Sequence, residues 1–217
     1  MCQTANPIVS GVTIPDTQLT KDIREFVRDT STELLFHYSS RVYYFAALRG
    51  QQLGLSYDAE LLYAGAMFHD LGLIPEHSSK TERFEVDGAN AARDFLRQRH
   101  ISEADAQQVW TSIALHTTPG IPKHMHPIVA LVTEGEEMDV LGLNYEHFND
   151  IQREAVLAAH PRSEDFKNDI ITAFYNGIKH KPHTCFGNVK ADVLAMKDTS
   201  FQAQNFCCTI LNSNWSA

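Results

Sequence analysis

Apolar residues recur every three or four positions along most of the chain, the spacing that places them on one face of an α-helix. Helices are predicted over residues 33–53, 59–71, 86–99, 102–116, 127–140, 148–159, 163–178 and 190–196, after a first helix capped by Thr17 or Thr20. Neither a strand pattern nor an internal repeat interrupts this order. The sequence therefore predicts a single all-α domain, a helical bundle.

The two ends of the chain lack this period. Residues 1–16 are irregular, with loosely alternating apolar positions, and we expect them to form an N-terminal arm that lies on the domain. Residues 17–197 form the predicted helical domain. Residues 198–217 are mostly polar, but Phe201, Phe206 and Trp215 predict a C-terminal tail that packs on the domain.

The stretch 59–71 is apolar nearly all round, so we expect it at the centre of the bundle. It ends on His69 and Asp70, which are costly to bury without a partner. His37 and Asp139 fall on two other predicted helices. Because imidazole and carboxylate groups suit zinc, iron and manganese, these four residues are predicted to bind one divalent metal ion, with Zn²⁺ the first expectation and Fe²⁺ or Mn²⁺ the alternatives.

The composition argues against several classes of function. At 43% apolar and 21% charged residues, the 217-residue chain resembles an ordinary globular protein. Its net charge of −9, without a dense run of Lys or Arg, argues against nucleic acid and membrane surfaces as partners. No apolar run approaches the roughly 20 residues of a spanning helix, and the N-terminus lacks the features of a secretory signal. Four cysteines without a CxxC spacing favour a reducing compartment, so a cytoplasmic location is expected.

The order His, His-Asp, Asp resembles the HD-domain superfamily of metal-dependent hydrolases, and within it the chain is similar to the cyanamide hydratase-like branch. Five stretches carry this second resemblance. They are residues 35–42 (LFHYSSRV) for the branch's Asn-His-Ser-x-Arg-Val, 68–72 (FHDLG) for Leu-His-Asp, 83–88 (RFEVDG) for Ser-Phe-acidic-x-x-Gly, 113–116 (IALH) for Ile-x-Arg-His, and 181–184 (KPHT) for Lys-Pro-Trp. The chain departs from these motifs at Phe36, Arg83 and Leu115, and no Trp follows Pro182.

The resemblance implies a single HD-domain bundle and an enzyme, a metal-dependent hydratase or hydrolase of a small molecule. In the branch, metal-activated water adds to a nitrile-type carbon, as in the conversion of cyanamide to urea. The resemblance also places His116 at the metal cavity, as the first candidate for a catalytic acid or base, with Glu85 the second. The residues expected to contact substrate are Lys80, Arg83, Phe84 and His183.

Several alternatives stay open. An HD-type phosphohydrolase acting on a nucleotide or phosphomonoester needs basic groups for phosphate, and the loops offer Lys80, Arg83 and Lys123. A di-iron oxygenase needs a further histidine besides His116, which residues 89–92 do not supply. A non-catalytic HD module, a buried polar network without metal, and homo-oligomerisation also stay open.

Overall fold

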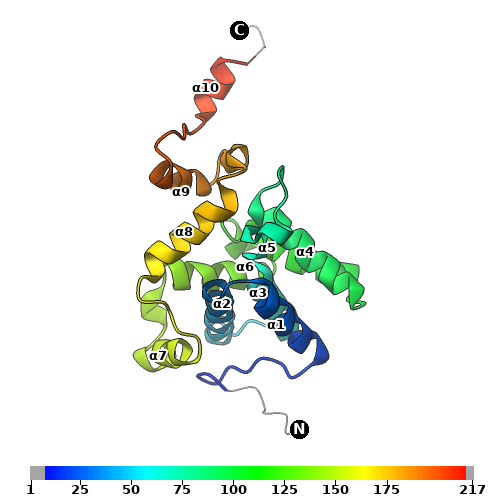
Figure 1. The fold of residues 1–217 in the computed structure, drawn as a ribbon. Helices are drawn as coiled ribbons and strands as arrows, with labels where there is room; N and C mark the ends of the chain where they lie inside the picture. The colour runs from blue at the N-terminus through cyan, green and yellow to red at the C-terminus, as the bar shows by residue number, and fades with distance from the viewer. Residues whose placement is uncertain (1–7, 214–217) are drawn as a thin grey trace.

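The computed structural model describes residues 8–213, and across this part of the chain it is all-α (Figure 1). No β-strand forms there, apart from one isolated bridge between Val9 and Val12. The helices are α1 Gln18–Thr30, α2 Glu33–Gln52, α3 Ala59–Phe68, α4 Phe84–Gln98, α5 Glu103–Leu115, α6 Pro127–Glu136, α7 Asp150–Ala159, α8 Phe166–Ile178, α9 Lys190–Lys197 and α10 Phe206–Leu211. The predicted fold class is therefore confirmed.

Helix boundaries follow the local chemistry of the chain. The side chain of Thr17 accepts a hydrogen bond from the Thr20 backbone N–H and so caps α1, as predicted. Pro127 opens α6, where its missing N–H costs nothing. The predicted third helix is too long, because α3 ends at Phe68 and a 3₁₀ turn, Leu71–Leu73, follows Asp70. This early end frees the backbone where the predicted metal ligands lie.

Helix α3 lies at the centre of the bundle, in contact with α1, α2, α4, α5 and α6. Its eight residues from Leu61 to Phe68 are all buried, which confirms the prediction from their all-round apolar character. Two glycines allow close approaches around it. A methyl group at Gly135 on α6 would collide with the Val42 carbonyl on α2, and one at Gly72 would collide with the Phe84 carbonyl on α4.

In the described part of the N-terminal arm, Val9, Val12 and Ile14 are buried in the core. The predicted packing of the C-terminal tail extends only to Phe201, which contacts the core. Residues 202–213 are exposed, and α10 projects away from the bundle beyond α9 (Figure 1). Trp215 lies outside the described residues. None of the helices in the described part of the chain is long and apolar enough to cross a bilayer.

Candidate metal centre

Two helix ends meet at the candidate site. Helix α3 is followed by His69 in a helical conformation, and Asp70 then leaves the helix with φ −103° and ψ 8°. Helix α5 ends at Leu115 and is followed by His116. One ligand atom from each of His69, Asp70 and His116 lies within 4.8 Å of the others. The backbone turn after α3 therefore lets two adjacent residues face the same point, with His116 from a second helix.

Both imidazoles are oriented by their own helices. Nδ1 of His69 lies 2.6 Å from the Ala66 carbonyl oxygen, and Nδ1 of His116 lies 2.6 Å from that of Ile113. A carbonyl only accepts, so each Nδ1 carries a proton and donates it. In a neutral ring this leaves the lone pair on Nε2, directed at Asp70. The two Nε2 atoms lie 3.6 Å (His69) and 3.5 Å (His116) from the oxygens of Asp70.

This arrangement fits a metal ion. The cluster is buried, with exposures of 0% for His69 and 2% for both Asp70 and His116. Nε2 of His69 and both carboxylate oxygens of Asp70 have no hydrogen-bond partner among the described residues. The 3.5 Å separation from His116 is also beyond a normal N–H···O bond. Buried polar atoms left unpaired are costly, and histidines whose other nitrogen donates to a carbonyl are typical metal ligands.

The charges of the cluster are consistent with this role. Burial lowers the pKa of His69 to about 4, against the opposing effect of Asp70. Burial raises the pKa of Asp70, but His69, His116 and Lys190 outweigh it and hold the pKa below its usual value. For His116, burial lowers the pKa, yet Asp70 and the more distant acidic residues raise it above its ordinary value. At neutral pH the cluster thus contains a carboxylate and a neutral His69, the forms that bind metal.

Two buried glutamates flank the cluster. Glu85, in the first turn of α4, accepts hydrogen bonds from Arg83, at 3.1 Å, and from the Thr117 hydroxyl. Glu85 and Arg83 thus form an ion pair, and Glu85 is only 1% exposed. Glu136, the last residue of α6, was not predicted as a site residue. Burial raises its pKa to about 7, although His116 and Lys190 oppose the shift.

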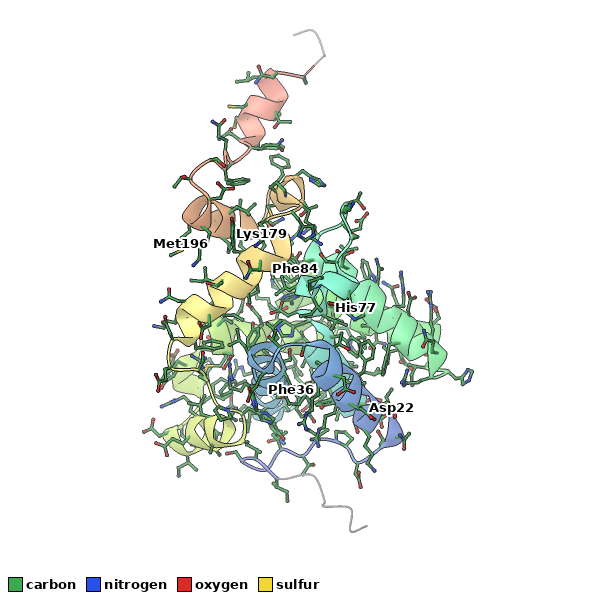
Figure 2. All side chains as sticks on the ribbon, in the orientation of Figure 1. Asp22, Phe36, His77, Phe84, Lys179 and Met196 are labelled. Carbon is green, nitrogen blue, oxygen red and sulfur yellow. The ribbon has the colours of Figure 1, made fainter. Side chains whose placement is uncertain are left out.

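A buried lysine also faces this region. Lys190, the first residue of α9, is 5% exposed, and its Nζ lies 3.8 Å from the ring centroid of Phe174 and 4.9 Å from that of Phe84. Its charge acts on the ionisation of Asp70, Glu85 and others in the site, so it lies close enough to influence them. Phe84 is buried in the interior (Figure 2), with its ring 5.7 Å from that of His116. Lys190 had no sequence signal, because only the fold brings α9 to the site.

The structure does not bring His37 to the cluster. Its Nδ1 lies 3.3 Å from Nδ1 of His160, and its Nε2 lies 3.7 Å from Glu33. The neighbouring residue, Tyr38, faces the site instead, with its ring centroid 4.9 Å from that of His69. Adjacent residues on a helix point about 100° apart, so only one of these two side chains can face α3.

Asp139 is likewise engaged elsewhere. Both of its oxygens accept hydrogen bonds from Arg41, Nε to Oδ1 and Nη2 to Oδ2, each at 2.9 Å. Arg162 adds a further bond to Oδ1 at 3.0 Å. Asp139 lies in a π-helical turn, Glu137–Leu141, that continues α6. With two guanidinium partners, this buried carboxylate needs no metal ion to balance its charge.

The residues predicted to contact substrate separate into two groups. Phe84 is at the cluster, and Arg83 is near it through Glu85. Lys80 and His183 are exposed on the surface, and neither is part of the cluster. The Lys-Pro stretch has a different role, because Lys181 forms a buried ion pair of 2.6 Å with Asp87.

A cavity of about 730 Å³ has Leu73 and Ile74, which follow closely after Asp70 in the chain, in its lining. None of the three cluster residues lines it. Its walls are mainly apolar, and its polar lining includes His37, Arg162 and Asp169. Of these, His37 precedes Tyr38 in the chain, and Arg162 donates a hydrogen bond to Asp139.

The fold and the cluster together define a helical protein with a candidate metal site of two histidines and one aspartate. A family model of the HD domain matches residues 36–164, which is more than half of the chain. The chain therefore belongs to the HD-domain family, whose members are typically metal-dependent hydrolases. No curated protein matches the sequence.

Proposed function

We propose that this protein is a mononuclear metal-dependent hydrolase or hydratase of a small molecule, with His69, Asp70 and His116 as the ligands of one divalent ion, Zn²⁺ in the first instance. The observation that supports this most is the set of buried, unpartnered atoms on His69 and Asp70. Three protein ligands with a remaining position for water are typical of catalytic zinc sites. When bound, such an ion lowers the pKa of water and polarises the substrate.

The two buried glutamates near the cluster have different proposed roles. Glu85 is held by Arg83 and Thr117, so we assign it to fixing the geometry around His116. Glu136 has no hydrogen bond of this kind and a pKa of about 7, which suits a group that takes up and releases a proton near neutral pH. The buried, nearly closed surroundings exclude bulk water from both groups.

We propose that substrate reaches the cluster from the 730 Å³ cavity that Leu73 and Ile74 line, whose mainly apolar surface favours a small, largely uncharged molecule. The cavity's cation, Arg162, is already bound to Asp139, and the acidic Asp169 also lines it. A phosphate group would find no free cation there. Cyanamide and small nitriles, the substrates of the branch that the sequence resembles, are therefore the first class to test.

One observation favours a second candidate, a phosphohydrolase. Lys190 is a buried cation near the cluster, and its ammonium group lies over the rings of Phe84 and Phe174. Such a group could hold an anionic substrate. The sequence offered Lys80 as one of the basic residues for this second candidate. In the structure Lys80 is exposed and is not part of the cluster.

Elemental analysis and a substrate panel test the proposal. We expect one metal ion per purified chain, its loss in His69→Ala, and its retention in a control, His147→Ala, in which the replaced histidine is exposed. Ammonia or urea release from cyanamide and nitriles is then compared with phosphate release from nucleotides and phosphomonoesters. Two ions per chain, or full activity without metal, would contradict the mononuclear assignment.

A further inference from the structure

Tyr38 occupies the side of the cluster that the sequence assigned to a histidine. It is 0% exposed, and its ring meets that of His69 edge-on, at 4.9 Å and 72°. Phe166 packs against it at 6.0 Å between ring centroids. Packing against His69 and Phe166 therefore fixes the position of this side chain, which belongs to helix α2.

The hydroxyl of Tyr38 has no hydrogen-bond partner among the described residues. The carboxylates of Glu136, Asp70 and Asp139 are all close enough to act on it electrostatically. A buried hydroxyl without a partner is unfavourable. Its location among these acids thus indicates that it bonds to something held at the cluster.

The spacing of the Asn-His-Ser-x-Arg-Val motif also places Tyr38 at the cluster. In Asn-His-Ser-x-Arg-Val the histidine precedes the arginine by three positions. With Phe36 on the asparagine and His37 on the histidine, one extra residue stands before Arg41. When Arg41 and Val42 are instead placed on the Arg-Val pair without a gap, Ser39 falls on the serine and Tyr38 on the histidine. His37 falls on the asparagine, which agrees with its contacts to His160 and Glu33 outside the cluster.

We propose that Tyr38 replaces a ligand histidine, so that the metal keeps three protein ligands and the Tyr38 hydroxyl hydrogen-bonds the molecule that occupies the position left open. This inference rests on the ligand set of the proposed function. It makes Tyr38 a determinant of what the site accepts, because a hydroxyl can select a bound molecule by its hydrogen-bonding atoms without coordinating the metal itself.

Cobalt(II) is the probe for the first test, since its absorption spectrum reports the number of ligands. In Tyr38→His a fourth ligand should tighten cobalt binding to metal-free protein by about tenfold or more and change the spectrum. Tyr38→Phe should leave affinity unchanged. The control is Tyr44→Phe, which removes another buried, unpartnered hydroxyl on the same helix. Circular dichroism checks that each variant is folded.

A second measurement uses azide added to the cobalt-loaded protein. Tyr38→Phe should weaken azide binding by up to about tenfold, the effect of one hydrogen bond, while Tyr44→Phe should not. The azide measurement still tests the inference if the Tyr38→His variant fails to fold, because it uses Tyr38→Phe.

Four results would overturn the inference. If Tyr38→Phe binds cobalt as poorly as His69→Ala does, the phenol is itself a ligand. Unchanged cobalt affinity and spectrum in a folded Tyr38→His variant would show that a side chain at position 38 does not reach the metal. Unchanged azide binding in Tyr38→Phe would show that the Tyr38 hydroxyl does not bond the molecule in the open position. If the wild-type chain binds no cobalt at all, the proposed function fails together with the inference. If wild type binds cobalt but the Tyr38 variants behave otherwise than expected, only the inference about Tyr38 fails.

Discussion

Two buried aspartates, Asp70 and Asp139, have opposite surroundings. Asp139 is 1% exposed and accepts three hydrogen bonds of 2.9–3.0 Å from Arg41 and Arg162. Asp70 is 2% exposed, and neither of its oxygens has a hydrogen-bond partner among the described residues. The Nε2 atoms of His69 and His116 lie 3.6 Å and 3.5 Å from its oxygens.

The difference shows what marks a functional carboxylate in this protein. Burial alone does not, since both side chains are equally buried. A carboxylate saturated by guanidinium groups is already neutralised and serves the structure. A carboxylate that lies beside two imidazoles and has no hydrogen-bond partner among the described residues keeps its coordinating capacity. We therefore propose Asp70 for the metal centre, whereas Asp139 joins α2 to the end of α6 through its bonds to Arg41.

The largest expected effect comes from exchanging the charge at each aspartate in turn. Asp70→Asn should abolish metal binding while leaving the metal-free protein folded, because it removes an unbonded buried charge. Asp139→Asn should keep the metal but lose about 1–3 kcal/mol of stability, since two guanidiniums lose their counter-charge. Metal content and urea unfolding of both variants are measured together. Loss of metal in a folded Asp139→Asn variant would place Asp139 in the site after all.

The arginine partner of Asp139 gives the next effect. Arg41 is 0% exposed and forms both of its bonds to Asp139 from within the core. Arg41→Met should cost about 3–5 kcal/mol of unfolding free energy, because it leaves Asp139 partly unpaired. Arg49→Met, which breaks a partly exposed bridge to Glu134, is the matched control and should cost about 1 kcal/mol or less. Equal losses in the two variants would contradict the distinction.

The sequence predicted the fold well because its helices carry their own signals. Helix caps, helix-opening proline and the 3.6-residue period are local properties, as Thr17 and Pro127 illustrate. The helix α10 was missed because its six residues are all exposed and carry no amphipathic period that packs on the domain. What the sequence did not predict at the C-terminal end was thus packing, which depends on distant partners.

The candidate site was predictable only in part. His69, Asp70 and His116 stand at helix ends, where a sequence shows them as polar residues closing apolar runs. The partners of Asp139 could not be seen, since Arg41 is 98 positions away. Whether His37 or Tyr38 is expected to face the cluster depends on a shift of one residue in the alignment of the chain to the motif. Lys190 and Glu136 gave no signal, because they become site residues only when α9 and α6 are placed beside α3 and α5.

Lys190 extends the comparison to the cations. Arg41 bonds its aspartate directly, whereas Lys190 rests on Phe84 and Phe174 near Asp70. Lys190→Met should therefore change stability by only about 1 kcal/mol. If the substrate is anionic, the same change should lower kcat/KM by about 100-fold, with part of the rate restored in Lys190→Arg. A stability loss as large as that of Arg41→Met would make Lys190 a structural ion partner instead.

The smallest effect concerns the histidine pair beside Arg41. Burial lowers the pKa of His160 to about 4, and the positive charges of His37 and Arg41 add to the shift. In the unfolded chain the pKa is about 6.5. Between pH 6.5 and 4 the unfolded state therefore binds more protons at this position, so the stability from neutral His160 is complete above pH 6.5 and decreases as the pH falls toward 4. Urea unfolding of metal-free protein across this range should show a shallower pH slope in His160→Gln than in wild type, by up to one proton. The exposed His147, changed in the same way, should leave the slope as it is, and an unchanged slope in His160→Gln would mean that His160 is protonated in the folded protein.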